Sequence, residues 1–171
     1  METTVKNEVV EEGMNVSGPT WKEMILEEHL ELFSELEVKR LVQQVVENAL
    51  DNVQREYIEK TYLESYEVAK RLKKVLSRQG GTGMVLDMIV AGALLAPSFK
   101  ELEKFTNYHP IEFEAYIREQ ELTEGVPDQI IESVCRVVRG YLGPDTPLKE
   151  FMPKPGSPEY LVATAYELLK N

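Results

Sequence analysis

The stretch 84–100 constrains the fold more than any other part of the chain, because it is the most apolar window in the sequence. Its apolar side chains recur at helical spacing: Leu86, Ile89, Val90, Ala93 and Leu94. A helix that is apolar on nearly every side is stable only where other helices surround it. Proline disfavours helix in the preceding residue, so this helix should end at Ala96-Pro97. The window therefore predicts the central helix of a bundle.

The composition is that of one soluble domain. The 171 residues are enough to bury a core, with 43% apolar and 29% charged residues. No apolar run reaches the roughly 18 residues of a membrane span, and residues 1–14 lack the order of a secretory signal. The single cysteine, Cys135, lies in an apolar run, which predicts a buried thiol rather than a reactive one. These features predict a cytoplasmic protein without a membrane partner.

The charge is strongly negative and unevenly distributed. The net charge is −11, and residues 1–60 carry 14 acidic against 6 basic side chains. A general nucleic-acid binder needs a basic surface, so that class is excluded. The acidic region can be a docking surface for a basic protein, a mimic of nucleic-acid charge, or a solvated face that keeps the chain soluble.

The first part of the chain predicts a tail and then long helices. Residues 1–18 are polar with two glycines and predict a flexible tail, while 19–171 predict one helical domain. A first helix should open at Pro19-Thr20. The motif Ser34-Glu35-Leu36-Glu37 fits a capping box for the next one. Because neither glycine nor proline occurs from there to Gln79, two helices are expected at about 35–54 and 56–78.

Glycine and proline divide the rest of the chain. Gly80, Gly81 and Gly83 predict a turn with Thr82 as a cap; without a preceding strand or a closing Lys-Ser/Thr, the turn is not a phosphate-binding loop. Ser98 and Glu101 should cap a short helix that ends near Phe105. Further helices are expected from Pro110 to Glu121, over 128–141, and from a Ser157-Pro158 cap to Lys170. No strand pattern occurs, so the predicted class is all-α.

Five segments, in order, resemble motifs of the HD-domain phosphohydrolase superfamily. The resemblance covers about two thirds of the chain. The family's opening His-Ser-x-x-Val-Ala helix is similar to Glu-Ser-Tyr-Glu-Val-Ala at 64–69, its Ala-Leu-Leu-His-Asp-x-x-Lys centre to Ala-Leu-Leu-Ala-Pro-Ser-Phe-Lys at 93–100, and its His-Pro-x-x-Gly-Ala segment to His-Pro-Ile-Glu-Phe-Glu-Ala at 109–115. The helix before its later histidine pair is similar to Val-Pro-Asp-Gln-Ile-Ile at 126–131, and its closing Ala-Asp helix to Leu-Val-Ala-Thr-Ala-Tyr at 161–166. The resemblance implies an HD-like helical bundle preceded by additional acidic helices over 19–60.

The chain departs from the family where the family binds divalent metals. The positions of the first histidine, the His-Asp pair and the late aspartate carry Glu64, Ala96, Pro97 and Tyr166, and the later histidine pair falls among Val137, Val138 and Arg139. Alanine, proline and neutral tyrosine do not replace nitrogen and carboxylate ligands. Without a bound ion, water with a pKa of about 15.7 supplies almost no hydroxide near pH 7. The resemblance therefore implies a domain without metal, cofactor or catalytic residues.

Two positions that lie near the phosphate-bearing pocket in the family persist as Lys100 and His109. Together with Glu64, Arg139 and Tyr166 they form the predicted ligand pocket, and the resemblance implies a nucleotide or other phosphorylated small molecule as its ligand. Lys100 can also be an exposed lysine and His109 a turn histidine. His29, between glutamates, is expected at the surface.

Three functions remain open. The domain can be an inactive HD-like protein that binds a phosphorylated small molecule in the pocket or a protein partner through its acidic helices. It can be a phosphohydrolase whose rearranged metal site uses Glu64, Asp87, His109 and Asp145. It can also be an acidic inhibitor that resembles DNA in charge. A homodimer through an apolar stripe of the acidic helices is also predicted: Leu36, Leu41, Val45 and Leu50.

Overall fold

The computed structural model describes residues 20–96, 105–106 and 108–170, and this part of the chain contains helices and no strands. The predicted all-α class is thereby confirmed, whereas the HD-like arrangement stays a prediction. The predicted tail 1–18, the cap at Ser98 and the side chain of Lys100 lie outside the described residues. The elements are α1 (Trp21–Leu30), α2 (Leu36–Asn52), α3 (Arg55–Arg78), α4 (Gly83–Leu95), α5 (His109–Glu119), α6 (Asp128–Gly140) and α7 (Pro158–Lys170), with the short 3-10 helices η1 (Gly143–Asp145) and η2 (Lys149–Phe151) before α7.

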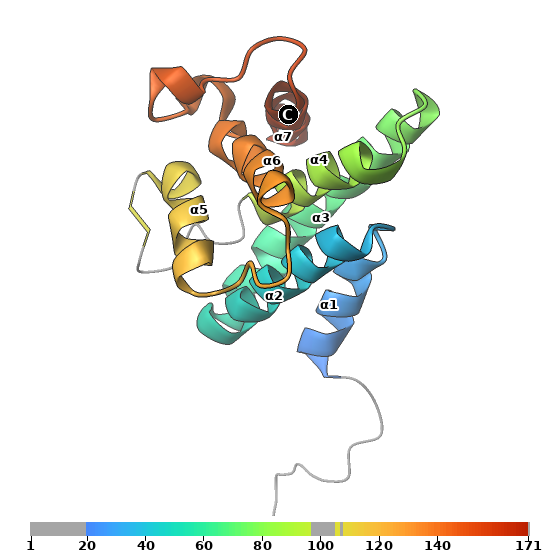
Figure 1. The fold of residues 1–171 in the computed structure, drawn as a ribbon, viewed down its shortest axis with the longest axis vertical. Helices are drawn as coiled ribbons and strands as arrows, with labels where there is room; N and C mark the ends of the chain where they lie inside the picture. Colours follow the sequence, from blue (N-terminus) through green and yellow to red (C-terminus); the bar gives the residue numbers. More distant parts are fainter. Residues whose placement is uncertain (1–19, 97–104, 107, 171) are drawn as a thin grey trace, which may run out of the picture.

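The helix α4 is the centre of the bundle, as its apolar sequence predicts. It contacts α2, α3, α6 and α7 (Figure 1). Every residue from Ile89 to Ala96 is buried, because helices on several sides remove the whole circumference from water. The closest approach is to α6: a β-carbon built on Gly92 would lie 2.5 Å from the β-carbon of Val137. Only a residue without a side chain fits at this crossing.

The two predicted helices after residue 35 are present as α2 and α3, and their break falls at Val53-Gln54. The stripe proposed for dimerisation does not face outward. Leu41, Val45 and Leu50 are buried in the core of this chain, and only Leu36 is exposed, at 79%. The prediction of a dimer through this stripe is therefore wrong, because the stripe already packs within the monomer.

The amino-terminal end of α2 is capped from a distance. Glu35 occupies the cap position without a side-chain cap, so the predicted local capping box is wrong. Oδ2 of Asp87, on α4, instead accepts hydrogen bonds from the backbone nitrogens of Ser34 at 2.9 Å and Glu35 at 2.8 Å. A carboxylate is well placed there because the first amides of a helix lack intrahelical partners.

The helix α1 begins where the sequence predicts. Thr20 is its cap, and Thr20 and Glu23 form a reciprocal capping box. The prediction for His29 is wrong: its side chain is 1% exposed, and its ring centroid lies 3.5 Å from that of Tyr62 on α3. The flanking glutamates suggested a polar surface, but His29 is one helical turn after Ile25 and lies on the inward face with it.

The carboxy-terminal half follows the predicted order. The helices α5, α6 and α7 agree with the predicted segments within about two residues, which is the usual uncertainty of a helix boundary. Ser157 caps α7 by accepting a hydrogen bond of 3.3 Å from the backbone nitrogen of Tyr160. Cys135 is buried, as predicted.

Candidate functional site

The predicted pocket residue His109 lies at the first position of α5, next to the carboxy-terminal end of α4. Its side chain is 3% exposed, and Nε2 lies 2.8 Å from the carbonyl oxygen of Ala96, to which it can donate a hydrogen bond. The ring also packs against Phe105 with a centroid distance of 4.8 Å. His109 is therefore held by the backbone and by an aromatic neighbour instead of facing solvent.

Tyr166, on α7, reaches the same end of α4. Its hydroxyl donates a hydrogen bond to the carbonyl oxygen of Ala93. Burial raises the pKa of this phenol well above its ordinary value, so the phenol stays neutral and does not offer the charged oxygen of an aspartate to a cation. The ring of Tyr141 lies near both residues, with its centroid 5.5 Å from that of the Tyr166 ring and 6.4 Å from that of the His109 ring.

Glu64, on α3, is exposed, and its charge acts on this aromatic group. Burial is the main reason that the pKa of Tyr141 is raised, and the neighbouring phenol of Tyr57 and the negative charge of Glu64 add to the effect. The same carboxylate contributes, after burial, to the raised pKa of Tyr166. The rings of His109 and Tyr166 thus both lie beside the ring of Tyr141, and Glu64 acts on that ring through its charge; the ligand pocket itself stays a prediction.

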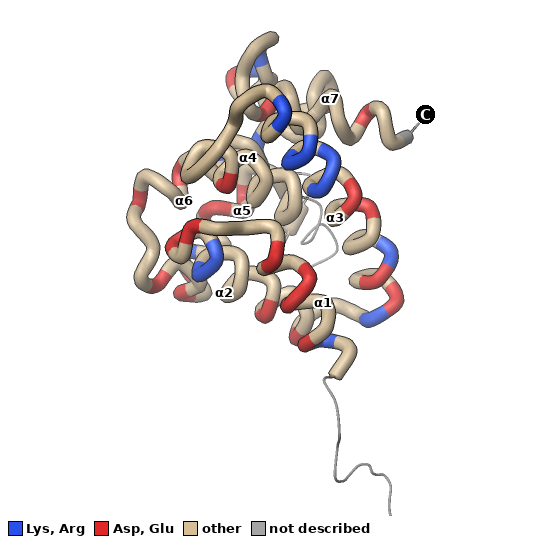
Figure 2. The backbone as a smooth tube through the Cα atoms, turned by 90° about the vertical axis from the view of Figure 1, so that its right-hand side faces the viewer, with Lys and Arg blue, Asp and Glu red and all other residues tan. Residues whose placement is uncertain are grey.

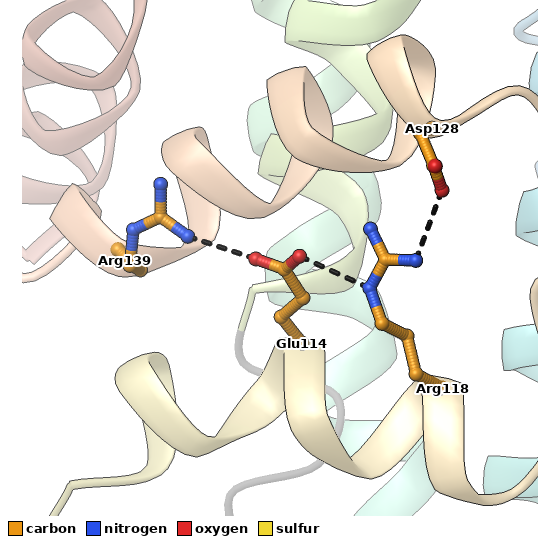
Figure 3. Close-up of polar contacts among 4 residues, drawn as sticks. All are labelled: Glu114, Arg118, Asp128 and Arg139. Atoms are coloured by element: carbon orange, nitrogen blue, oxygen red, sulfur yellow. Dashed lines mark hydrogen bonds and ion pairs between the residues drawn. The ribbon is translucent and has the colours of Figure 1, made fainter.

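Arg139 takes a different position. Its guanidinium Nη1 lies 3.1 Å from Oε1 of Glu114, and the group stacks 5.2 Å from the ring centre of Phe151. Figure 3 shows that Glu114 also pairs with Arg118, at 3.1 Å, and that Arg118 pairs with Asp128, at 3.0 Å. Arg139 therefore belongs to a network that joins α5 to α6, and its charge is already compensated.

The described side chains do not assemble a metal centre. No group of three or more histidine, cysteine, aspartate or glutamate residues in this part of the chain is placed to hold an ion. The rearranged site requires Asp87, which is 2% exposed and bound to the backbone ahead of α2. Because one oxygen of Asp87 accepts both amide hydrogen bonds there, moving it to an ion would uncap α2.

A groove that the sequence does not predict runs along α1 and the start of α3. Its volume is about 380 Å³, and Figure 2 shows acidic residues recurring along this part of the backbone. The apolar part comes from Trp21, Met24 and Ile25, and Met24 is 57% exposed. The acidic part comes from four glutamates: Glu27, Glu28, Glu31 and Glu59. The glutamates that alternate with apolar residues over 21–31 are the sequence signal from which this groove could have been inferred.

A second groove of about 320 Å³ lies between α6, η2 and the start of α7. It contains Arg136 and Arg139, but each guanidinium is paired with a carboxylate. Nε of Arg136 lies 2.9 Å from Glu159, and Arg139 pairs with Glu114 as described. An anionic ligand would have to compete with both carboxylates for these two cations.

Two further findings concern membrane insertion and similarity to known proteins. Within the described residues, none of the helices combines the length and the apolar character that crossing a bilayer requires. In comparisons with known proteins, no family model, no curated protein and no solved structure matches this chain.

Proposed function

We propose that this chain is an HD-like helical domain that acts by binding a basic protein partner through its acidic helices, and not by hydrolysing phosphoesters. The observation that carries the proposal is that two side chains at the carboxy-terminal end of α4 already bind backbone carbonyl groups. His109 contacts the carbonyl of Ala96, and the neutral hydroxyl of Tyr166 contacts that of Ala93. A neutral tyrosine hydroxyl and a single histidine do not supply the set of nitrogen and carboxylate ligands that holds an ion and activates water.

The charges favour a protein partner over a phosphorylated small molecule. Of the cations predicted for the pocket, Arg139 is paired with Glu114, and the chain as a whole carries a charge of −11. The side chains of Glu27, Glu28 and Glu31 are exposed and make no ion pair with any other described residue. A cationic partner is therefore attracted by carboxylates that no other described side chain neutralises, whereas an anion is repelled by the net negative charge of the chain.

The proposal makes two measurements informative. The protein, purified without chelator, should contain no stoichiometric divalent metal, and it should not turn over nucleotides or generic phosphoesters with added manganese or magnesium. Its binding to a basic test protein should weaken steeply between low and high salt, because exposed charges are screened beyond about 8 Å at physiological ionic strength.

A phosphorylated ligand is the competing result. Thermal unfolding in the presence of a nucleotide panel detects it, because a ligand that binds only the folded state adds about 2.7 kcal/mol of stability at a hundredfold excess over its Kd. Such a shift, together with salt-insensitive binding of the basic protein, would overturn the proposal.

A further inference from the structure

The groove along α1 and α3 has the composition of a docking site for a short segment. Trp21 and Ile25 are half-buried, so the groove has an apolar floor, while the side chain of Met24 projects into solvent. The volume of about 380 Å³ is at the lower end of the range of about 300–1,000 Å³ for ligand sites. It therefore suits a few side chains of a peptide segment.

The carboxylates at the edge of the groove indicate the charge of the occupant. Glu27 and Glu28 lie on α1, and Glu31, the residue that caps the carboxy-terminal end of α1, lies within one turn of both. Like charges at this spacing destabilise a helix. Within the described chain no lysine or arginine side chain forms an ion pair with any of these three residues. A cation bound between them would relieve the repulsion.

Arg55 shows within the chain how this surface holds a guanidinium. Its Cζ lies 4.8 Å from the centre of the Trp21 ring, and its Nε lies 2.9 Å from Oε1 of Glu59, which lines the groove. An arginine is thus held between an aromatic face and a carboxylate, an arrangement in which cation–π attraction and ion pairing act together. The three glutamates at the carboxy-terminal end of α1, Glu27, Glu28 and Glu31, offer carboxylates for further cations beside it.

We propose that this groove binds a segment of the protein partner in which arginine residues flank an aliphatic anchor. The aliphatic side chain packs on Met24 and Ile25, and the arginines pair with the glutamates at the carboxy-terminal end of α1. Apolar contact gives the segment its register, and the charges steer its approach and exclude acidic segments. This inference rests on the proposed function and adds to it the surface and the chemistry of the bound segment.

The test uses the full chain and a short fluorescein-labelled peptide of arginine and leucine, with a glutamate-and-leucine peptide as its matched control. Fluorescence anisotropy should show binding of the arginine peptide only. The double variant Glu27→Lys/Glu31→Lys should weaken it by about tenfold or more, because two attractions become repulsions. The control variant Glu37→Lys/Glu47→Lys makes the same change of net charge on exposed positions of α2 outside the groove, and should lose much less.

The outcomes separate the groove from the proposed function. Equal losses in both double variants, or none in either, would place the binding outside the groove and overturn this inference while leaving an acidic binding protein intact. If the unaltered chain binds neither peptide, or both equally, even at low salt, the proposed function fails as well. Circular dichroism of each variant shows that the helices are retained, as expected for exposed substitutions.

Discussion

Asp87, near the start of α4, caps α2 by accepting a hydrogen bond of 2.8 Å from the backbone amide of Glu35. The two residues are 52 positions apart. The bond fixes the beginning of α2 to α4. Within the described part of the apolar window 84–100, Asp87 is the one acidic residue. The polar contact thus orders the junction between α1 and α2 against the core.

Replacing Asp87 with alanine should destabilise the fold by about 2–3 kcal/mol, because two amides would lose a charged acceptor in a nearly buried position. Asp87→Asn should cost less, since its oxygen can still accept both bonds. Ser34→Ala is the control: its hydroxyl lies 3.5 Å from the carboxylate, so its loss should have little effect. Urea unfolding of the three variants measures the differences. A cost for Ser34→Ala equal to that of Asp87→Ala would contradict the assignment.

His29 should make stability depend on pH. Burial lowers the pKa of its ring well below 6.5, and neither ring nitrogen has a hydrogen-bond partner within the described chain. Below about pH 6.5 the unfolded chain therefore takes up a proton that the folded chain does not, and the free energy of unfolding falls as the pH falls, by up to about 1.4 kcal/mol per pH unit. Above pH 7 this contribution to the slope vanishes.

The comparison of the chain with His29→Phe isolates this effect from the titration of carboxylates. Denaturant unfolding between pH 5 and pH 8 should show that the difference in stability between the two proteins changes below about pH 6.5 and is constant above pH 7. Parallel curves over the whole range would show that His29 takes up its proton equally in both states, contrary to its burial.

Gly92→Ala should disrupt the contact of α4 with α6. The added methyl group would lie 2.5 Å from Val137, and overpacking of this kind costs about 1–3 kcal/mol. Val137→Ala alone leaves a cavity, but combined with Gly92→Ala it removes the clash, so the double variant should be more stable than the sum of the single effects predicts. Thermal or urea unfolding of the full cycle measures this coupling; strict additivity would argue against the close crossing.

Cys135 should be inert in the folded protein. Burial raises the pKa of its thiol to about 12, so the reactive thiolate is scarce near neutral pH. An aromatic disulfide reagent should react slowly with the native chain and completely in urea. Fast labelling of the native chain, with its stability unchanged, would show that the thiol is accessible.

The helices could be predicted from the sequence where local signals mark their ends. Pro97 follows the central helix, Pro110 lies in the first turn of α5, and Ser157-Pro158 opens α7. The break between α2 and α3 could be expected from length alone, and its position at Val53-Gln54 carries no glycine or proline. That boundary is decided by packing of both helices on α4 rather than by local propensity.

The errors concern contacts between distant segments. The motif Ser34–Glu37 predicts that α2 is capped by its own neighbouring side chains, whereas the acceptor is Asp87 on α4. The neighbouring glutamates of His29 favour a surface position. Its spacing of one helical turn from Ile25 was the signal that indicates an inward position. Of the residues predicted for the pocket, His109 and Tyr166 both lie beside Tyr141, whereas Arg139 pairs with Glu114, a contact that its own sequence segment does not indicate. The ligand pocket itself stays a prediction.

Trp21 is the only tryptophan of the chain, and it lies in the groove of α1 and α3 under the guanidinium of Arg55. The indole emission of the whole protein therefore originates from this one surface. An occupant that displaces Arg55 or shields the ring changes the emission spectrum directly, so the surface contains an intrinsic, label-free optical reporter of its own occupancy.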